Sequence, residues 1–272
     1  MKEHLSGKQA SQELPLIEFK NVTVMKENSR VLDRVTLSLY EGENVAILGP
    51  NGAGKSSLIK AVIREYYPLI TGEPGTFRFR GEEVWDIFDL RSTIGIVSTD
   101  LQYAFARTIT GHEVILSGFF SSIGLFNREI TPAMEKKSEE IEQILGIRHL
   151  RERPMISLST GEARRFLIGR ALVFDPATLL LDEPASSLDL SALHIFRQTL
   201  RTIAQSGTGI ILVTHNLHDI IPEITRVVMI KEGRIIGDGE KAAMLTDERI
   251  GQLFSVPVRI RKENGWYYAT GY

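Results

Sequence analysis

The stretch Gly49–Ser57, GPNGAGKSS, directly follows the short apolar run Val45–Leu48. It matches the pattern G-x-x-x-x-G-K-[ST], in which glycines let backbone N–H groups turn inward around phosphates and the next helix adds positive potential. A glycine-rich turn matches this pattern by chance in about 1 chain in 100 of this length. The strand before it and a helix beginning near Lys55 favour nucleotide binding instead. The predicted phosphate-binding residues are Gly49, Pro50, Asn51, Gly52, Ala53, Gly54, Lys55, Ser56 and Ser57.

Apolar strands on either side of this stretch indicate the fold class. Uniformly apolar runs are typical of parallel strands covered on both faces, and three more follow, at Ile94–Val97, Thr178–Leu181 and Ile210–Val213. Upstream, apolar and polar residues alternate around Ile17–Val24 and Val35–Leu39, which predicts an antiparallel sheet with one wet face. We therefore predict an α/β fold: a P-loop NTPase with a mainly parallel core sheet, an N-terminal antiparallel β subdomain and a helical insert.

The insert is predicted over about residues 100–173, where apolar residues fall at helical spacing. Thr131 and Pro132 are typical of an N-cap and a first helical position, and Gly146 of the residue that ends a helix. We expect a flexible tail over residues 1–16, one domain over 17–261 and a C-terminal tail over 262–272. Alternation around Val256–Arg261 and Gly265–Tyr268 predicts a strand pair added to a sheet edge.

An acidic pair follows the run Thr178–Leu181, in the sequence TLLLDEP. The strand delivers Asp182 and Glu183 to its carboxyl end, where ligands bind in open α/β sheets. A solvated acidic pair at a strand end is common, but after a phosphate loop the pair gains a chemical meaning. Asp182 is predicted to hold Mg²⁺, and Glu183 to orient and deprotonate the attacking water.

Two further segments extend the predicted site. Leu158–Glu162, LSTGE, opens a helix with Ser159 as its N-cap, and Gly161 would present its N–H at the positive helix end. Alone, this is an ordinary capped helix. Ser186–Asp189, SSLD, follows the acidic pair, and His215 comes directly after the strand at Ile210. That strand ends at the same edge as Gly49 and Asp182, which is why we single out His215 although a lone histidine there is usually structural.

These motifs occur in the order found in the ATP-binding subunits of ABC transporters, which the chain resembles from about Ile17 to Ile260. The resemblance implies an ATPase that uses ATP and Mg²⁺ and forms a head-to-tail dimer with a second copy, with two ATP molecules sandwiched between subunits. It implies that Ser159 and Gly161 act in trans, that Glu183 is the catalytic base and that His215 contacts the γ-phosphate. Asp189 would couple the two sites across the interface.

Three positions depart from the family pattern. The position that usually holds an adenine-stacking aromatic residue holds Lys26, whose stem could cover the base. The position of the usual Gln after the strand at Ile94 holds Thr99, and we assign the role of touching Mg²⁺ to the nearest glutamine, Gln102. The signature has Glu162 for the usual Gln; its charge favours the helix N-terminus but would lie near ATP and weaken the closed dimer.

Composition excludes several classes of protein. The chain has 272 residues and no Cys, so it has no disulfide framework or thiolate metal site. Its formal charge of −2 argues against a nucleic-acid coat, and no partner nucleic acid is expected. It has no apolar run of about 18 residues and no secretory signal. The remaining histidines lack metal-ligand spacing and are predicted to be surface or capping residues: His4, His112, His149, His194 and His218. Trp85 and Trp266 are expected to be packing anchors.

Two classes of function remain open. In the first, the chain powers a membrane importer from the cytoplasmic face, docked on a transmembrane permease and acting through it on an extracytoplasmic solute-binding protein. Segments around Ser98–Phe126 and Leu253–Ile260 resemble ATPases of molybdenum and iron-chelate transport, which favours a metal oxyanion or a metal chelate as the solute. In the second, it is a soluble ABC ATPase acting on nucleic acid or ribosomes. A P-loop kinase would leave LSTGE and SSLD unexplained.

Overall fold

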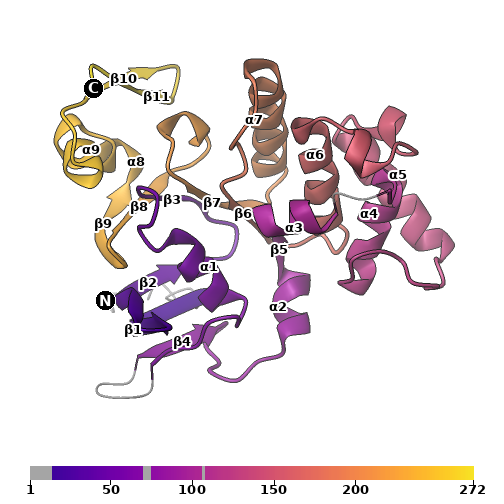
Figure 1. Ribbon diagram of the computed structural model, residues 1–272, viewed down its shortest axis with the longest axis horizontal. Helices are drawn as coiled ribbons and strands as arrows, with labels where there is room; N and C mark the ends of the chain where they lie inside the picture. Colours follow the sequence, from indigo (N-terminus) through magenta and orange to yellow (C-terminus); the bar gives the residue numbers. More distant parts are fainter. Residues whose placement is uncertain (1–13, 70–74, 106–107) are drawn as a thin grey trace, which may run out of the picture.

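The computed structural model describes residues 14–69, 75–105 and 108–272, and its centre is a six-stranded sheet (Figure 1). In spatial order its strands are β5 (Ile94–Val97), β6 (Thr178–Asp182), β7 (Gly209–Thr214), β3 (Asn44–Leu48), β8 (Arg226–Lys231) and β9 (Arg234–Glu240). Neighbouring strands are parallel except for β9, which runs antiparallel to β8. The mainly parallel core is confirmed, and β8 and β9 extend it beyond the strands predicted from the sequence.

The two faces of this sheet are covered by different layers. Side chains alternate along β3, so Val45 and Ile47 pack with the antiparallel strands and with α1 (Lys55–Val62). Ala46 and Leu48 face the opposite core, which contains residues of α6 (Thr160–Ala171) and α7 (Leu190–Gln205). Burial on both faces explains why this strand has no polar alternation.

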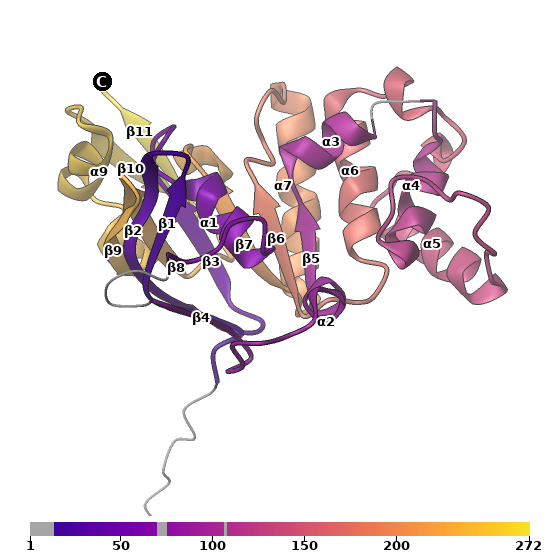
Figure 2. The ribbon, with the colours of Figure 1, turned by 60° about the horizontal axis from the view of Figure 1, so that its bottom comes forward.

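The first layer is a three-stranded antiparallel sheet in the order β2 (Ser29–Leu39), β1 (Ile17–Lys26) and β4 (Thr76–Phe79) (Figure 2). Trp85 packs its ring against Phe77 and Phe79, as expected of an anchor. The polypeptide then passes through α2 (Ile87–Thr93) into β5.

The helical insert lies between β5 and β6 and forms one end of the molecule (Figure 1). Its α-helices are α3 (Thr99–Ala104), α4 (Gly111–Ser117), α5 (Pro132–Ile144) and α6, with short 3₁₀ turns at Gly118–Phe120, Arg148–Leu150 and Met155–Ser157. Thr131 caps α5, with Pro132 at its first position and Gly146 at φ +64° after its end, as predicted. No helix in the described residues is long and apolar enough to cross a membrane.

The C-terminal segment lies at the other end of the molecule (Figure 1). It contains α8 (Lys241–Met244), α9 (Asp247–Phe254), β10 (Arg259–Glu263) and β11 (Trp266–Thr270). The prediction that the last two strands join a sheet edge is wrong: within the described residues they pair only with each other. Alternation shows that a strand forms but not which strand it joins. Tyr267 is buried and Trp266 lies under the Arg197 guanidinium, so β11 packs on the domain.

Candidate nucleotide site

The phosphate loop is the turn from β3 into α1, and close packing explains two of its glycines. A Cβ on Gly49 would lie 2.2 Å from the carbonyl oxygen of Ile230, so any other side chain would collide with β8. Gly54 caps α1 at φ +103°, a conformation that L side chains rarely adopt, and a Cβ there would lie 2.7 Å from the Val31 carbonyl oxygen. The N-terminus of α1 therefore opens directly into the loop, where its free N–H groups favour an anion.

Lys55 is buried inside this loop, with a side chain only 6% exposed. Its Nζ donates to the carbonyl oxygens of Gly49 (2.7 Å) and Pro50 (2.9 Å) and lies 3.2 Å from Glu183 Oε1. A buried ammonium needs such partners because it has left water. The structure therefore brings the predicted phosphate-binding lysine into contact with the predicted base.

Asp182 has the environment of a cation ligand. Among the described residues no hydrogen bond reaches its buried Oδ1 atom. Burial, with the charge of Glu183, raises the pKa of Asp182 to about 6, while the hydrogen bond with Ser56 and the charge of Lys55 oppose that rise. Hydroxyl and carboxylate oxygens are the hard ligands that Mg²⁺ takes, and a dication would restore the charged form of the carboxyl. Ser56 and Asp182 therefore fit a Mg²⁺ site.

Glu183 and His215 come together at the same sheet edge, from the ends of β6 and β7. Glu183 Oε2 lies 2.6 Å from His215 Nδ1, and the Glu183 N–H donates to the Val213 carbonyl. Glu183 has φ +48°, a left-handed backbone that is uncommon outside glycine and frequent at functional sites. One carboxylate thus contacts both the lysine of the phosphate loop and the histidine after β7.

A groove of about 560 Å³ runs along the phosphate loop. Lys26, which was predicted to cover the base, lines it together with Asn51, Gly52 and Glu183. Sequence reasoning missed other lining residues, among them Arg30, Tyr66 and Glu232. Arg30 follows the β1–β2 turn and is held by a 2.9 Å ion pair with Asp33, so its place beside Lys26 could be inferred from the hairpin. No local pattern pointed to Tyr66 or Glu232.

A second, smaller pocket of about 190 Å³ gathers the signature residues. Ser159, Gly161 and Asp189 line it together, so the structure unites the residues predicted to act in trans and keeps them apart from the phosphate-loop groove. Asp189 is the N-cap of α7 and accepts from the Ala192 N–H at 2.8 Å. A Cβ on Gly161 would lie 2.9 Å from the Ala192 Cβ, which explains the close approach of the two helix ends.

Glu162 belongs to a capping box at the start of α6. The Ser159 Oγ accepts from the Glu162 N–H, and Glu162 Oε2 accepts from the Ser159 N–H at 2.8 Å. Burial opposes ionisation, but the bonds from Ser159 and the charges of Arg153 and Arg165 lower the pKa of Glu162. The S-x-x-E spacing could have predicted this motif.

Gln102 does not join the cation site in this structure. Its Oε1 accepts from Arg164 Nη2 at 2.8 Å, and the same guanidinium donates to the Pro184 and Ser186 carbonyls. The prediction of Gln102 as a Mg²⁺ contact is therefore not supported by its placement, because α3 turns this side chain toward α6. The backbone of Thr99 begins α3, whose N-cap is Ser98.

The position of His112 in the structure differs from the prediction. It was predicted to be a surface or capping residue, but it is buried between α4 and α5, with Nδ1 2.7 Å from Glu142 Oε1 and Nε2 2.9 Å from Glu135 Oε2. Glu135 and Glu142 are seven residues apart and share one helix face, a signal that the sequence contained. His149 and His194 are exposed, His218 is half-buried against Tyr268, and His4 lies outside the described residues.

Comparison with known proteins identifies the family. Residues 32–186, more than half of the chain, match the family described as ABC transporter. The uncharacterized ABC transporter ATP-binding protein YlmA of Bacillus subtilis is 33% identical over 251 residues, covering 90% of this chain and 93% of YlmA. The hemin import ATP-binding protein HmuV of Bradyrhizobium diazoefficiens is 30% identical over 270 residues, with 93% of each chain covered.

A solved structure agrees with both relatives. That of cbiO1 from Clostridium perfringens, described as part of the ABC transporter complex cbiONQ, matches with a TM-score of 0.68 at 26% identity, over 88% of this chain and 94% of cbiO1. Family match, relatives and fold agree with the ordered motifs and with the cluster of Lys55, Glu183 and His215. The chain belongs to the ABC transporter family, as an ATP-binding subunit of the ATP-hydrolysing type.

Proposed function

We propose that this subunit powers a membrane importer of a metal chelate or a metal oxyanion, working on the cytoplasmic face of the membrane. One observation supports the ATPase part of this proposal most strongly: the phosphate-loop groove and the signature pocket are separate surfaces with no lining residue in common. The proposal assigns a role to the residues of each surface.

On the phosphate-loop side, Lys55 binds the β- and γ-phosphate oxygens and the loop N–H groups share their charge. Glu183 orients a water molecule and takes its proton as the water oxygen bonds to the γ-phosphorus and the bond from that phosphorus to the bridging oxygen breaks to release ADP. His215 donates a hydrogen bond to the γ-phosphate. Ser56 and Asp182 would hold Mg²⁺, which neutralises phosphate charge when bound. Chelation of Mg²⁺ should therefore stop turnover, and full activity in excess chelator would contradict this assignment. Lys26 covers the base.

The remaining half of each site comes from a second copy of the chain. Ser159 and Gly161 lie at the positive N-terminus of α6 and face the ATP bound by the partner's phosphate loop. Asp189 caps α7 at the same pocket and couples the two sites across the dimer interface. In this arrangement the subunit hydrolyses ATP only as a head-to-tail dimer.

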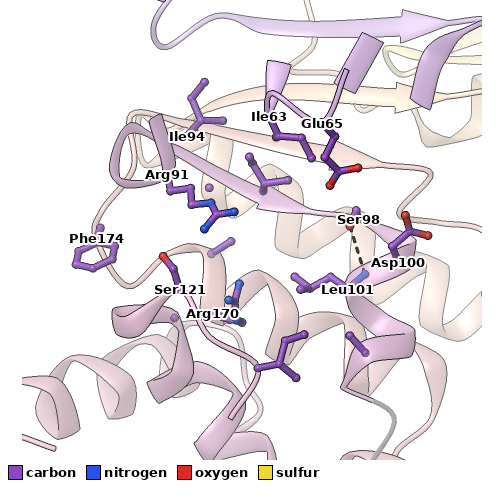
Figure 3. A pocket seen from close by; sticks show the side chains of 16 residues that line it. Ile63, Glu65, Arg91, Ile94, Ser98, Asp100, Leu101, Ser121, Arg170 and Phe174 are labelled. Carbon is purple, nitrogen blue, oxygen red and sulfur yellow. Dashed lines mark hydrogen bonds between the residues drawn. The ribbon is translucent and has the colours of Figure 1, made fainter. Parts of the chain in front are cut away.

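The permease is proposed to dock in a groove of about 380 Å³ between the sheet and the insert (Figure 3). Leu101, Ile123 and Phe174 are among its apolar lining residues. The guanidinium groups of Arg91, from α2, and Arg170, from α6, also line it, and Asp100 belongs to α3. Ile123 and Phe174 are 43% and 46% exposed, large apolar side chains that a partner would cover. The segment Ser98–Phe126 forms much of this groove.

The solute class follows from likeness to relatives. HmuV, a hemin import protein, is similar over nearly its whole length, and hemin is a metal chelate. A metal oxyanion is the second solute that the sequence resemblance favours. An extracytoplasmic solute-binding protein would deliver either one to the permease.

The test is affinity purification of the tagged chain from native membranes, followed by metal analysis of the solute bound by the co-purified complex. A membrane-spanning partner and a bound metal species are expected. Ile123→Glu should release that partner, while Ile236→Glu, at a similarly exposed position on β9, should retain it. Recovery of ribosomes or nucleic acid without a membrane partner would instead support the soluble ABC ATPase.

A further inference from the structure

The guanidinium of Arg164, a residue of α6, lies between α3 and the loop that follows β6. It lies in α6, three residues after Gly161, and is only 4% exposed. Nη1 donates to the carbonyl oxygens of Pro184 and of Ser186, the latter at 3.2 Å, and Nη2 donates to Gln102 Oε1 at 2.8 Å. One side chain thus connects α6, α3 and the loop after β6.

This placement is costly for a cation. The hydrogen-bond partners of Arg164 in the described part of the chain are carbonyl and amide oxygens, so no carboxylate contacts its buried charge directly. Burial lowers the pKa of Arg164, and the charge of Asp219 only partly opposes that effect. A position that served packing alone would be more stable with an apolar side chain of similar volume.

The loop that Arg164 holds contains the strained backbone of the proposed base. Glu183 has φ +48° and Ser187 φ +65°. Outside glycine such a left-handed backbone is strained and persists only where its surroundings fix it. The Glu183 carbonyl accepts from the N–H and Oγ of Ser186, and Arg164 fixes the next two free carbonyls of the same turn.

The other arm of Arg164 reaches the wall of the permease groove. Gln102 lies in α3, and its neighbours Asp100 and Leu101 line that groove. A shift of α3 would therefore change the hydrogen bond from Arg164 to Gln102. Because the same guanidinium also donates to the Pro184 carbonyl, the shift would change that hydrogen bond beside Glu183 as well.

We propose that Arg164 is a positioning residue for ATP hydrolysis: it fixes the Glu183 carboxylate in its working direction and ties that loop to the groove wall through Gln102. The inference rests on the proposed role of Glu183. It adds a residue that contacts neither nucleotide nor metal but on which the rate of the chemical step depends.

The test compares turnover with nucleotide affinity in the full chain. Arg164→Met should lower kcat for Mg-ATP by about 10- to 100-fold, because small displacements of a catalytic group have effects of this size. The Kd for ADP should stay within about twofold, since Arg164 is remote from the phosphate loop contacts. Arg164→Lys keeps the charge but not the fork of donors, so its kcat should fall to an intermediate value with an unchanged Kd.

Arg151→Met is the matched control, because it removes a multiply bonded guanidinium of the insert that contacts no part of the Glu183 loop. It should destabilise the fold and keep kcat. Wild-type kcat in Arg164→Met would overturn the inference, as would parallel losses of kcat and Kd in both Arg164→Met and Arg151→Met. If Arg164→Met does not fold, wild-type kcat in Arg164→Lys overturns it. An inactive wild-type chain would refute the proposed function, and the inference with it.

Discussion

The phosphate-loop groove and the signature pocket differ in what they contain. The groove, on the sheet, is lined by the buried cation Lys55 and by the Glu183 carboxylate that contacts it, and His215 contacts the same carboxylate. The signature pocket, between α6 and α7, has two helix N-termini, capped by Ser159 and Asp189, and neither a lysine nor a histidine among its lining residues. The groove therefore has the groups proposed to act on the γ-phosphate, and the signature pocket has positive helix ends that favour an anion bound by another chain.

The proposed head-to-tail dimer requires this difference, since in it each surface is completed by the other surface of the partner chain. The two pockets share no lining residue, although both are reached from the loop that links β6 to α7. A variant at one of the two surfaces should therefore be able to change the rate of hydrolysis without abolishing nucleotide binding.

The largest effect is expected on the phosphate-loop side. Glu183→Gln should reduce kcat by about 10²- to 10⁴-fold, because the amide cannot take a proton from water. ATP binding should persist, since Lys55 keeps its carbonyl partners, and an ATP-bound dimer should accumulate in size-exclusion chromatography. Glu263→Gln, at an exposed site on β10, should behave like the wild type. Brisk hydrolysis by Glu183→Gln would remove Glu183 as the base.

A mixing experiment tests whether the two surfaces complete each other across chains. Lys55→Ala should inactivate the phosphate-loop groove. Gly161→Asp should inactivate the signature pocket, because the new Cβ collides with Ala192 and the new carboxylate repels the phosphates of ATP. Random pairing makes half of the dimers mixed, each with one intact composite site, so the mixture should recover up to about a quarter of wild-type activity. ATPase assays on each variant and on their mixture provide the measurement. No recovery would contradict action in trans by independent sites.

The groove and the pocket also differ in how far the sequence predicts them. The groove is set by local geometry: a buried strand, a glycine turn and a helix place Lys55 and Ser56, and parallel strands bring Asp182 and His215 to the same edge. The partners of the insert depend on how helices pack, which periodicity does not specify. His112 and Gln102 were misassigned for that reason, since their contacts come from α5 and α6. The pairing of β10 with β11 was missed for a different reason, because alternation predicts a strand but not which strand it joins.

A third prediction concerns the anchoring of the insert that presents the signature. Burial opposes protonation of His112, but the hydrogen bond and charge of Glu142, with help from Glu135 and against the charge of Arg151, raise the pKa of His112. A pKa raised by folding stabilises the fold fully below the unfolded value of about 6.5, and that stability is lost as the pH rises through the folded pKa.

The variant His112→Gln should therefore lower the free energy of unfolding most at low pH. It removes the cation 2.7 Å from the fully buried Glu142 and leaves that carboxylate only the longer ion pair with Arg151 at 3.5 Å, a change of about 1 to 3 kcal/mol in the free energy of unfolding. Denaturant titrations between about pH 6 and pH 9 should show the gap from the wild type narrowing as the pH rises. The Kd for ADP at the groove should be unchanged. A gap that is constant or widens with pH would refute the charged His112 cluster.

The smallest effect is expected at the rim of the signature pocket, where Glu162 carries a charge close to the partner's ATP in the proposed dimer. Glu162→Gln keeps the reciprocal bonds of the capping box, because an amide oxygen also accepts from the Ser159 N–H. It removes only the repulsion between carboxylate and phosphate, which at a partly exposed site is worth about 0.2 to 1 kcal/mol. In the Glu183→Gln background, ATP-dependent dimerisation should therefore tighten by about two- to fivefold at low salt and less at high salt. Weaker dimerisation of the Glu162→Gln variant would contradict this expectation. It would show that the Glu162 carboxylate stabilises the dimer interface and does not repel the partner's ATP.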